Sequence, residues 1–253
     1  MLKVEKKLLS LVYKDTLQPS VQVIGKSLKA VVEFVSIPLM ALQLQNDKAR
    51  LNFEKRLNDY GAKLNAIPEE KRIEVHPQIG VPIVEKLLYT TSDQIAELFS
   101  NLLASASNID TVNSVHPAFI SMIERMSPDE ARILEYLKDK EDIQYCDINA
   151  YSNQNPGYNT LYEHVTMVED DVALTYPQNT NAYLANFVSL GILLDKKGVF
   201  RMDKTQYNRI RKRYQVEALT EKLVPTIYKS IEVDESYYQV TPFGKLFIQA
   251  CIK

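Results

Sequence analysis

Glycine is the residue whose scarcity most constrains this chain, because only 7 of its 253 residues are glycine. Glycine serves tight turns and backbone positions with positive φ, and it costs about 1 kcal/mol inside a helix. A chain so poor in glycine is predicted to be mainly helical. The scarcity also excludes classes of function, since the sequence contains no G-x-G-x-x-G, no G-x-x-x-x-G-K-[ST] and no G-x-S-x-G motif.

The charge and the cysteine content are those of a globular protein in a reducing compartment. The chain carries 30 basic and 32 acidic residues, and 45% of its residues are apolar. Its cysteines, Cys146 and Cys251, have no C-x-x-C spacing, so neither a disulfide framework nor a zinc site is expected. No signal peptide is recognised at the N-terminus. We expect a cytoplasmic protein that binds no cofactor, with membrane association on activation as an open alternative.

Residues 1–126 are predicted to form an all-helical domain. Apolar residues recur at i, i+3 and i+4 spacing from Val21 to Leu44. The most apolar run, Ala30 to Leu42, is shorter than the about 20 residues that a membrane-spanning helix needs. We interpret this run as a buried core helix, and the alternative is a segment that interacts with a membrane. The residues that would then contact lipid are Val31, Val32, Phe34, Val35, Ile37 and Leu39.

A second domain is predicted over residues 127–253, because Ser127 and Glu130 have the spacing of a capping box at a helix start. Beyond it, the expected order is helix, short strand, helix, a helix ending at Gly191, hairpin and final helix. This order is that of a winged helix-turn-helix, with a helical insertion at residues 201–235. The expected strands are Tyr145 to Ile148, Ile192 to Leu194, and Tyr237 to Val240.

The predicted fold class is therefore mainly α. It consists of an N-terminal helical bundle followed by an α+β winged-helix-like domain that carries an inserted helical segment. A fold of this kind does not by itself fix a function, so the function has to be argued from particular residues.

Charge is segregated within the second domain. Residues 129–171 hold 11 acidic and 3 basic residues, whereas residues 196–213 hold 8 basic residues and one acid. Two interpretations stay open: a basic face that pairs with the acidic segment, which we favour, and a surface that binds nucleic acid or another partner. The uncharged helix before Gly191 weakens the nucleic-acid interpretation. The candidate binding residues are Lys196, Lys197, Arg201, Arg209, Arg211, Lys212 and Arg213.

No combination of residues indicates a catalytic or a metal site. His76, His116 and His164 are far apart in the sequence. Many defence ribonucleases have an arginine and a histidine with about four to six residues between them, whereas Arg72 and His76 have only three residues between them. We interpret the acidic run Glu169 to Asp171 as a solvated turn. We therefore predict no catalytic residue and no metal ligand, and a protein that is not an enzyme.

Several motifs resemble those of the bacterial Abi-alpha family, which is named for abortive infection. The most specific motif is Glu97-Leu98-Phe99-x-Asn101-Leu102-Leu103-Ala104-Ser105-Ala106, and Val240-Thr241-Pro242-Phe243-Gly244 lies near the C-terminus. The resemblance implies an association with phage defence, in which the infected cell is sacrificed, and it supplies no catalytic residues. From the residues alone, Glu97 and Asn101 are expected to cap or pair within the helical bundle.

Two functions from different classes follow from these observations. The first is a non-enzymatic antiphage effector or adaptor, which acts on a protein partner from the phage or the host, or on a membrane. The alternative is a winged-helix regulator that binds nucleic acid. Self-association into a homo-oligomer is plausible for the apolar helical half, and a nuclease with an unrecognised site is the weakest interpretation.

Overall fold

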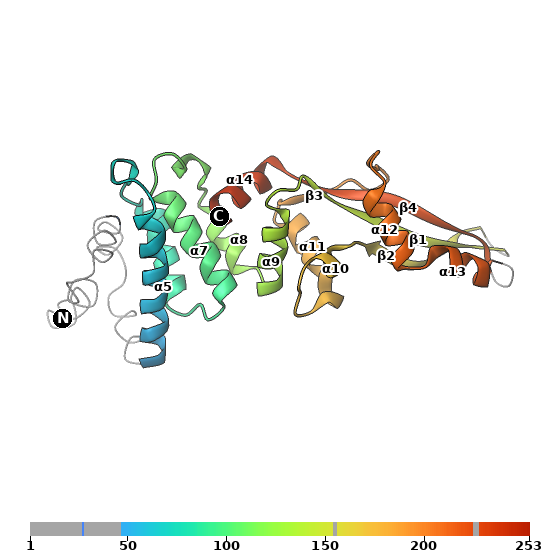
Figure 1. Cartoon of the computed structure of the whole chain (residues 1–253), viewed down its shortest axis with the longest axis horizontal. Coiled ribbons are helices and arrows are strands. Elements are labelled where there is room, and N and C mark those ends of the chain that lie inside the picture. Colours follow the sequence, from blue (N-terminus) through green and yellow to red (C-terminus); the bar gives the residue numbers. More distant parts are fainter. Residues whose placement is uncertain (1–26, 28–46, 154–155, 225–227) are drawn as a thin grey trace. The chain divides into compact units, whose positions relative to one another are not determined.

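The computed structural model describes Ser27 and residues 47–153, 156–224 and 228–253 (Figure 1). Within these residues the chain is mixed α+β, with ten α-helices and one four-stranded antiparallel sheet. The sequence predicted a mainly helical chain with a smaller α+β part. The helices agree with this prediction, whereas the four-stranded sheet is larger than the wing hairpin that was expected.

The chain divides into two compact units, which we call unit 1 and unit 2. Unit 2 is Arg132–Lys245, and unit 1 is the part of the chain before it together with Leu246–Lys253. Both divisions fall inside helices, α9 (Pro128–Leu137) and α14 (Pro242–Cys251). The predicted domains, which meet between residues 126 and 127, stay a prediction. They differ from the two units in residues 127–131 and in the last residues of α14, which belong to unit 1.

Helix α9 starts where the sequence predicts a helix start. The N–H of Ser127 donates to Glu130 Oε2 at 2.6 Å, and the N–H of Glu130 donates to Ser127 Oγ at 3.3 Å. These reciprocal bonds satisfy amide groups that have no partner inside the helix. The predicted capping box is confirmed.

Unit 1 is built around α7 (Asp93–Ala106), against which α5, α6 and α8 each pack. Ser92 caps α7, because its hydroxyl accepts a hydrogen bond from the N–H of Ile95 at 3.3 Å. The buried side chains of α7 include Leu98, Phe99, Leu102 and Leu103. The other elements of unit 1 are α5 (Asp47–Asn65), η1 (Glu69–Lys71), α6 (Pro77–Leu87), η2 (Val112–Ser114) and α8 (Ala118–Glu124).

Polar side chains of α7 bind the end of α14. Asn101 Nδ2 donates to the carbonyl oxygen of Cys251 at 2.9 Å, and Ser105 Oγ donates to that of Ala250 at 2.8 Å. The last carbonyls of a helix have no partner within the helix, so these bonds satisfy groups that are buried here. Glu97 forms an ion pair with a lysine of α5 at 2.5 Å. The expected capping and pairing roles of Glu97 and Asn101 are confirmed.

Unit 2 is built on the sheet, whose strands lie in the order β2-β1-β4-β3, all antiparallel. Figure 1 shows β1 and β4 as long strands side by side, and they pair from Asp142 opposite Gln239 to Ser152 opposite Tyr228. The strands are β1 (Asp142–Ser152), β2 (Tyr158–Val165), β3 (Leu193–Asp195) and β4 (Tyr228–Val240). The helices are α10 (Val168–Asp171), η3 (Pro177–Asn179), α11 (Thr180–Ser189), α12 (Thr205–Arg213) and α13 (Val216–Leu223).

Alternation along β1 gives the sheet one apolar and one polar face. On the apolar face, Cys146 and Ile148 are buried in a core with Tyr207 and Ile210 of α12. The opposite face carries polar side chains that bind one another; for example, Asn149 Nδ2 donates to an Asp234 carboxylate oxygen at 2.8 Å. Helix α12 therefore covers one face of the sheet, and its polar side faces the acidic segment.

The predicted strands all exist, although each belongs to a larger sheet than expected. Residues 145–148 lie within β1, and residues 237–240 lie within β4, whose 13 residues reach back into the predicted insertion. The insertion is helical in α12 and α13, as predicted, but residues 228–235 are strand, so this part of the prediction is wrong. The four-stranded sheet does not show the winged-helix architecture, which stays a prediction.

The start of α14 is bound to the turn that follows α11. Thr241 Oγ1 donates to the carbonyl oxygen of Gly191 at 2.6 Å and accepts from the N–H of Gly244 at 2.8 Å. The N–H of Thr241 donates to the carbonyl oxygen of Ile192 at 2.9 Å. A Cβ atom on Gly244 would lie 2.3 Å from that oxygen, so the close approach of the two backbones requires glycine. Gly191 has φ +73°, which confirms its predicted position just after a helix.

The apolar run that was predicted to be core or membrane-interactive lies outside the described residues. It contains Val31, Val32, Phe34, Val35, Ile37 and Leu39. Among the described helices, none is long and apolar enough to cross a membrane.

Both cysteines are buried, free thiols, Cys146 in unit 2 and Cys251 in unit 1. Burial raises the pKa of Cys146 to about 12, and it also raises the pKa of Cys251. Both thiols are therefore protonated at neutral pH and are poor nucleophiles while the protein is folded.

Candidate functional site

The basic segment of unit 2 forms ion pairs with the acidic segment, as the favoured interpretation expects. The Arg209 guanidinium donates two hydrogen bonds to the Asp171 carboxylate, at 2.6 and 3.0 Å. Arg213 pairs with the neighbouring Asp170. The further ion pairs are Arg201–Asp142 at 2.8 Å, Arg211–Glu235 at 3.1 Å and Lys197–Asp147 at 3.5 Å.

Five of the seven predicted binding residues thus have a carboxylate partner. Lys196 and Lys212 form no ion pair within the part of the chain that the structure describes. A phosphate that approached the arginines would have to replace existing carboxylate contacts, which are charge-assisted hydrogen bonds. Nucleic-acid binding by this segment stays a prediction.

The pairing of Asp171 with Arg209 predicts a specific dependence of stability on pH. The Arg209 hydrogen bonds hold the pKa of Asp171 below its ordinary value of 3.8, and burial acts in the opposite direction. A carboxyl whose pKa is lowered by folding adds stability above its unfolded pKa, and this stability is lost as the pH falls through the folded pKa. We expect Asp171→Asn to lower the free energy of unfolding by about 1 kcal/mol at neutral pH.

Urea unfolding of the two proteins checks this expectation, and the difference between them should shrink below about pH 3.8. Asp139→Asn is the matched control, because Asp139 is exposed and has no ion pair among the described residues. A difference between wild type and Asp171→Asn that is the same at acid and neutral pH would contradict the assigned role.

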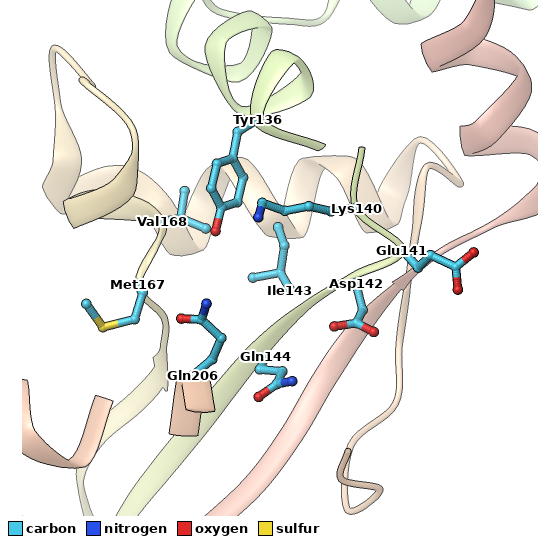
Figure 2. Close-up of a pocket in the computed structure, with 9 residues that line it drawn as sticks. All are labelled: Tyr136, Lys140, Glu141, Asp142, Ile143, Gln144, Met167, Val168 and Gln206. Atoms are coloured by element: carbon cyan, nitrogen blue, oxygen red, sulfur yellow. The ribbon is translucent and has the colours of Figure 1, made fainter. Parts of the chain in front are cut away.

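A cavity of about 210 Å³ lies next to this ion pair in unit 2, and Gln206 and Tyr136, which are hydrogen-bonded to Arg209 and Asp171, line it (Figure 2). It lies between the end of α9, the start of β1, α10 and α12. Figure 2 shows Tyr136 on one side of the cavity and the side chains of Gln144 and Gln206 on the other. Its lining residues are Tyr136, Lys140, Glu141, Asp142, Ile143, Gln144, Met167, Val168 and Gln206.

Arg209 holds two walls of this cavity together. Besides Asp171, it donates to Gln206 Oε1 at 2.8 Å. Asp171 in turn accepts a hydrogen bond from the Tyr136 hydroxyl at 3.1 Å. Burial, with the charge of Asp171, raises the pKa of Tyr136 to about 12, so the hydroxyl stays protonated and remains a donor. Arg209, predicted as a binding residue, is therefore a positioning residue for the cavity.

The charged groups of the cavity are largely neutralised by neighbours. Glu141 pairs with Lys245 at 2.9 Å, and Asp142 pairs with Arg201 at 2.8 Å. The Lys140 ammonium lies 4.4 Å from the centre of the Tyr136 ring and forms no ion pair within the described residues. Gln144 Oε1 is buried and accepts no hydrogen bond there.

Sequence reasoning missed the residues that face this cavity. Gln144 and Gln206 come from a strand and a helix that are far apart in the chain, and neither belongs to a motif. The only usable signal was the charge segregation, which indicated that the segments containing Asp171 and Arg209 meet.

The loop between β3 and α12 exposes apolar side chains. The exposed fractions are 51% for Val199, 54% for Phe200 and 86% for Met202. The loop is nevertheless well bound to the sheet and to α12, because the N–H of Gly198 donates to Ser236 Oγ at 2.9 Å and that of Arg201 donates to the Tyr207 hydroxyl at 3.2 Å.

The histidines have local structural partners. His76 and His116 accept hydrogen bonds on Nδ1 from backbone N–H groups two residues ahead, at 3.2 and 3.1 Å. His164 has φ +49°, and its N–H donates to Asp147 at 2.7 Å. Among the described residues, no group of three or more His, Cys, Asp or Glu side chains is placed to hold a metal ion.

Comparison with known proteins identifies one family. The family model described as abortive infection alpha matches residues 45–251. A search of curated proteins returned no match. A solved structure of an uncharacterized protein from the hydrocarbon-degrading marine bacterium Alcanivorax borkumensis SK2 is 15% identical and covers 51% of this chain and 88% of that one. Its TM-score of 0.33 is too low to support an argument about fold or function.

Proposed function

The chain belongs to the abortive infection alpha family, and from this premise we propose that it is a non-enzymatic effector or adaptor in phage defence. Membership over nearly the whole described chain supports the defence role. The manner of action is our inference: contact with a protein partner from the phage or the host, through the loop between β3 and α12.

The exposed apolar side chains of this loop carry the proposal. Val199, Phe200 and Met202 lie within four positions of one another and are each at least half exposed. Exposed apolar groups that are close together are typical of protein-binding surfaces, and aromatic side chains contribute strongly to binding there. Because the backbone of the loop is bound to β4 and α12, little ordering entropy would be lost when a partner binds.

The other modes of action have less support. Nucleic-acid binding, the alternative with a winged helix, would use arginines that already hold carboxylates. The proposed membrane contact depends on residues 31–39, outside the described residues. Self-association could use the same loop, and the experiment below separates it from binding to another protein.

The test is phage plating on bacteria that express the chain. We expect the wild type to reduce plaque formation, and Phe200→Asp with Met202→Asp to restore it at least about tenfold, because a charge placed in an apolar contact is costly to desolvate. Gel filtration of the wild type and the double variant separates the two uses of the loop. A smaller apparent size of the variant would indicate that the loop mediates self-association, and equal sizes would indicate that it binds another protein.

Ile109→Asp is the matched control, since Ile109 is 58% exposed in unit 1. It should protect as well as the wild type does. The proposal is wrong if the wild type neither arrests growth nor protects against any phage tested. The assignment to the loop is wrong if the double variant folds and still protects fully.

A further inference from the structure

We propose that the open edge of β4 binds an extended segment of the protein partner as an added strand, and that this segment alternates basic and apolar residues. The inference rests on the proposed function, since it specifies the partner that the loop between β3 and α12 would contact. Three features carry it: unpaired backbone groups along the edge, a groove with unpaired carboxylates on one face of the sheet, and partly buried apolar side chains on the other face.

The edge of β4 is open over about half of its length. Strand β3 pairs with residues 238–240 of β4, and the N–H of Lys196 donates to the carbonyl oxygen of Tyr237 at 2.9 Å. Figure 1 shows β4 continuing well beyond β3. In that part, residues 230–235 pair with β1 on one side and with no described strand on the other side.

The backbone groups that this edge exposes follow from the pairing. In an antiparallel sheet, the N–H and C=O groups of successive residues point to opposite sides of the strand. Ile231, Val233 and Glu235 lie an even number of positions from Tyr237, which bonds on the β3 side, so their backbone groups also point away from β1. There they form no hydrogen bond with the described residues. Such a row of unpaired groups is a template for an additional strand.

A groove of about 550 Å³ adjoins this edge. Its lining includes residues 233–236 of β4, polar residues of β1 and β2, and Lys197 and Phe200 of the loop between β3 and α12. An added strand beside β4 would therefore enter the groove and come next to Phe200, whose ring is largely exposed. The edge and the loop of the proposed function thus belong to one surface.

The groove has more carboxylates than its own cations neutralise. Two of them, Asp147 and Glu235, form ion pairs with a lysine and an arginine that also line it. The other two, Asp234 and Glu163, are exposed and form no ion pair with the described residues. The Asn149 amide donates to one Asp234 oxygen at 2.8 Å, which holds this carboxylate on the polar face of the sheet. A lysine or an arginine on the neighbouring strand would complement it.

The other face of the same edge carries apolar side chains. Ile231 and Val233 are partly buried and pack against the core that α12 forms with the sheet. Successive side chains of a strand point to opposite faces, so a segment with a basic residue beside Asp234 has its next side chain beside Val233. An apolar side chain there would bury more of this core's border. The edge therefore favours a segment in which basic and apolar residues alternate.

The test is fluorescence anisotropy of a labelled heptapeptide of alternating arginine and valine, titrated with the full chain. We expect saturable binding that weakens as salt is added, because exposed charges are screened. A peptide with glutamine in place of arginine should bind at least about tenfold more weakly. N-methylation of the valines should weaken binding as much, because the valines of an antiparallel segment lie opposite Val233 and supply the N–H groups that pair with β4.

Variants of the chain test the two faces of the edge separately. Val233→Pro removes an outward N–H group and leaves the hydrogen bonds between β4 and β1 in place, so the protein should fold and lose peptide binding. Asp234→Asn with Glu163→Gln removes the unpaired charges and should weaken binding at least about tenfold. Asp139→Asn is the matched control, because Asp139 is exposed without an ion pair among the described residues, and it should leave the affinity unchanged. Circular dichroism establishes that each variant is folded.

The inference is overturned if the arginine–valine peptide does not bind, if the glutamine or the N-methylated peptide binds equally well, or if the folded variants keep the wild-type affinity. A smaller apparent size of Val233→Pro on gel filtration would show that a second copy of the chain occupies the edge, and it would also overturn the inference. If the wild type protects against phage but does not bind the peptide, the inference fails and the proposed function stands. If it binds the peptide but does not protect, the proposed function fails instead.

Discussion

Replacing Gly244 with alanine is expected to lower the free energy of unfolding of unit 2 by about 3 kcal/mol, at the upper end of the usual cost of overpacking. The added Cβ would lie 2.3 Å from the carbonyl oxygen of Ile192 and 3.0 Å from its carbonyl carbon. These are backbone atoms, which cannot rotate away as the end of a long side chain can. The start of α14 would have to move, and the hydrogen bonds of Thr241 to Gly191 and Ile192 would weaken with it.

Gly198→Ala is the control for this prediction. Gly198 also prefers glycine, since its φ is +77°, but a Cβ there would meet nothing within 4 Å. Its cost should therefore be limited to backbone strain, about 1 kcal/mol. Urea unfolding followed by circular dichroism measures both variants. Equal stability losses would mean that the close approach at Gly244 relaxes freely.

The second large effect is expected in unit 1, from the double substitution Asn101→Ala and Ser105→Ala. Each side chain donates to a carbonyl at the end of α14, and Asn101 is only 3% exposed. Without the donors, two carbonyls stay buried and unpaired, at about 1–3 kcal/mol each. We expect a loss of about 3 kcal/mol in the free energy of unfolding, with fraying of the last turn of α14.

Hydrogen exchange of the amides near the C-terminus measures the fraying directly. Ser121→Ala is the control, because Ser121 is exposed and donates only within its own helix, to Ala118 at 2.9 Å. It should change stability by less than about 0.5 kcal/mol. The capping role is contradicted if the double variant is as stable as this control and its terminal amides remain protected.

Local signals predicted the helix ends well. The capping box of Ser127 and Glu130 and the end of α11 at Gly191 were both predicted, because each depends on residues close together in the chain. The pairing of the basic and acidic segments was predicted from charge alone, although the individual partners were not.

The strands were harder to predict for a physical reason. Strand β2 lies at an edge of the sheet, and seven of its eight residues are not buried, so it shows no apolar alternation. Strand β1 buries polar residues, among them Asp147 and Asn149, on the face opposite its apolar one. Because the polar residues of this strand are buried as well, they do not mark a solvent-exposed side. The cavity was beyond local reasoning, because Gln144 and Gln206 meet only through the fold.

The two buried thiols have a practical consequence for every variant described above. A protonated, buried thiol reacts with an alkylating reagent only after its surroundings open, so its labelling rate reports the free energy of that opening. Cys251 reports on unit 1 and Cys146 on unit 2. The protein thus carries one natural labelling site in each unit. Mass spectrometry of the two labelled peptides can show which unit has lost stability, without any added probe.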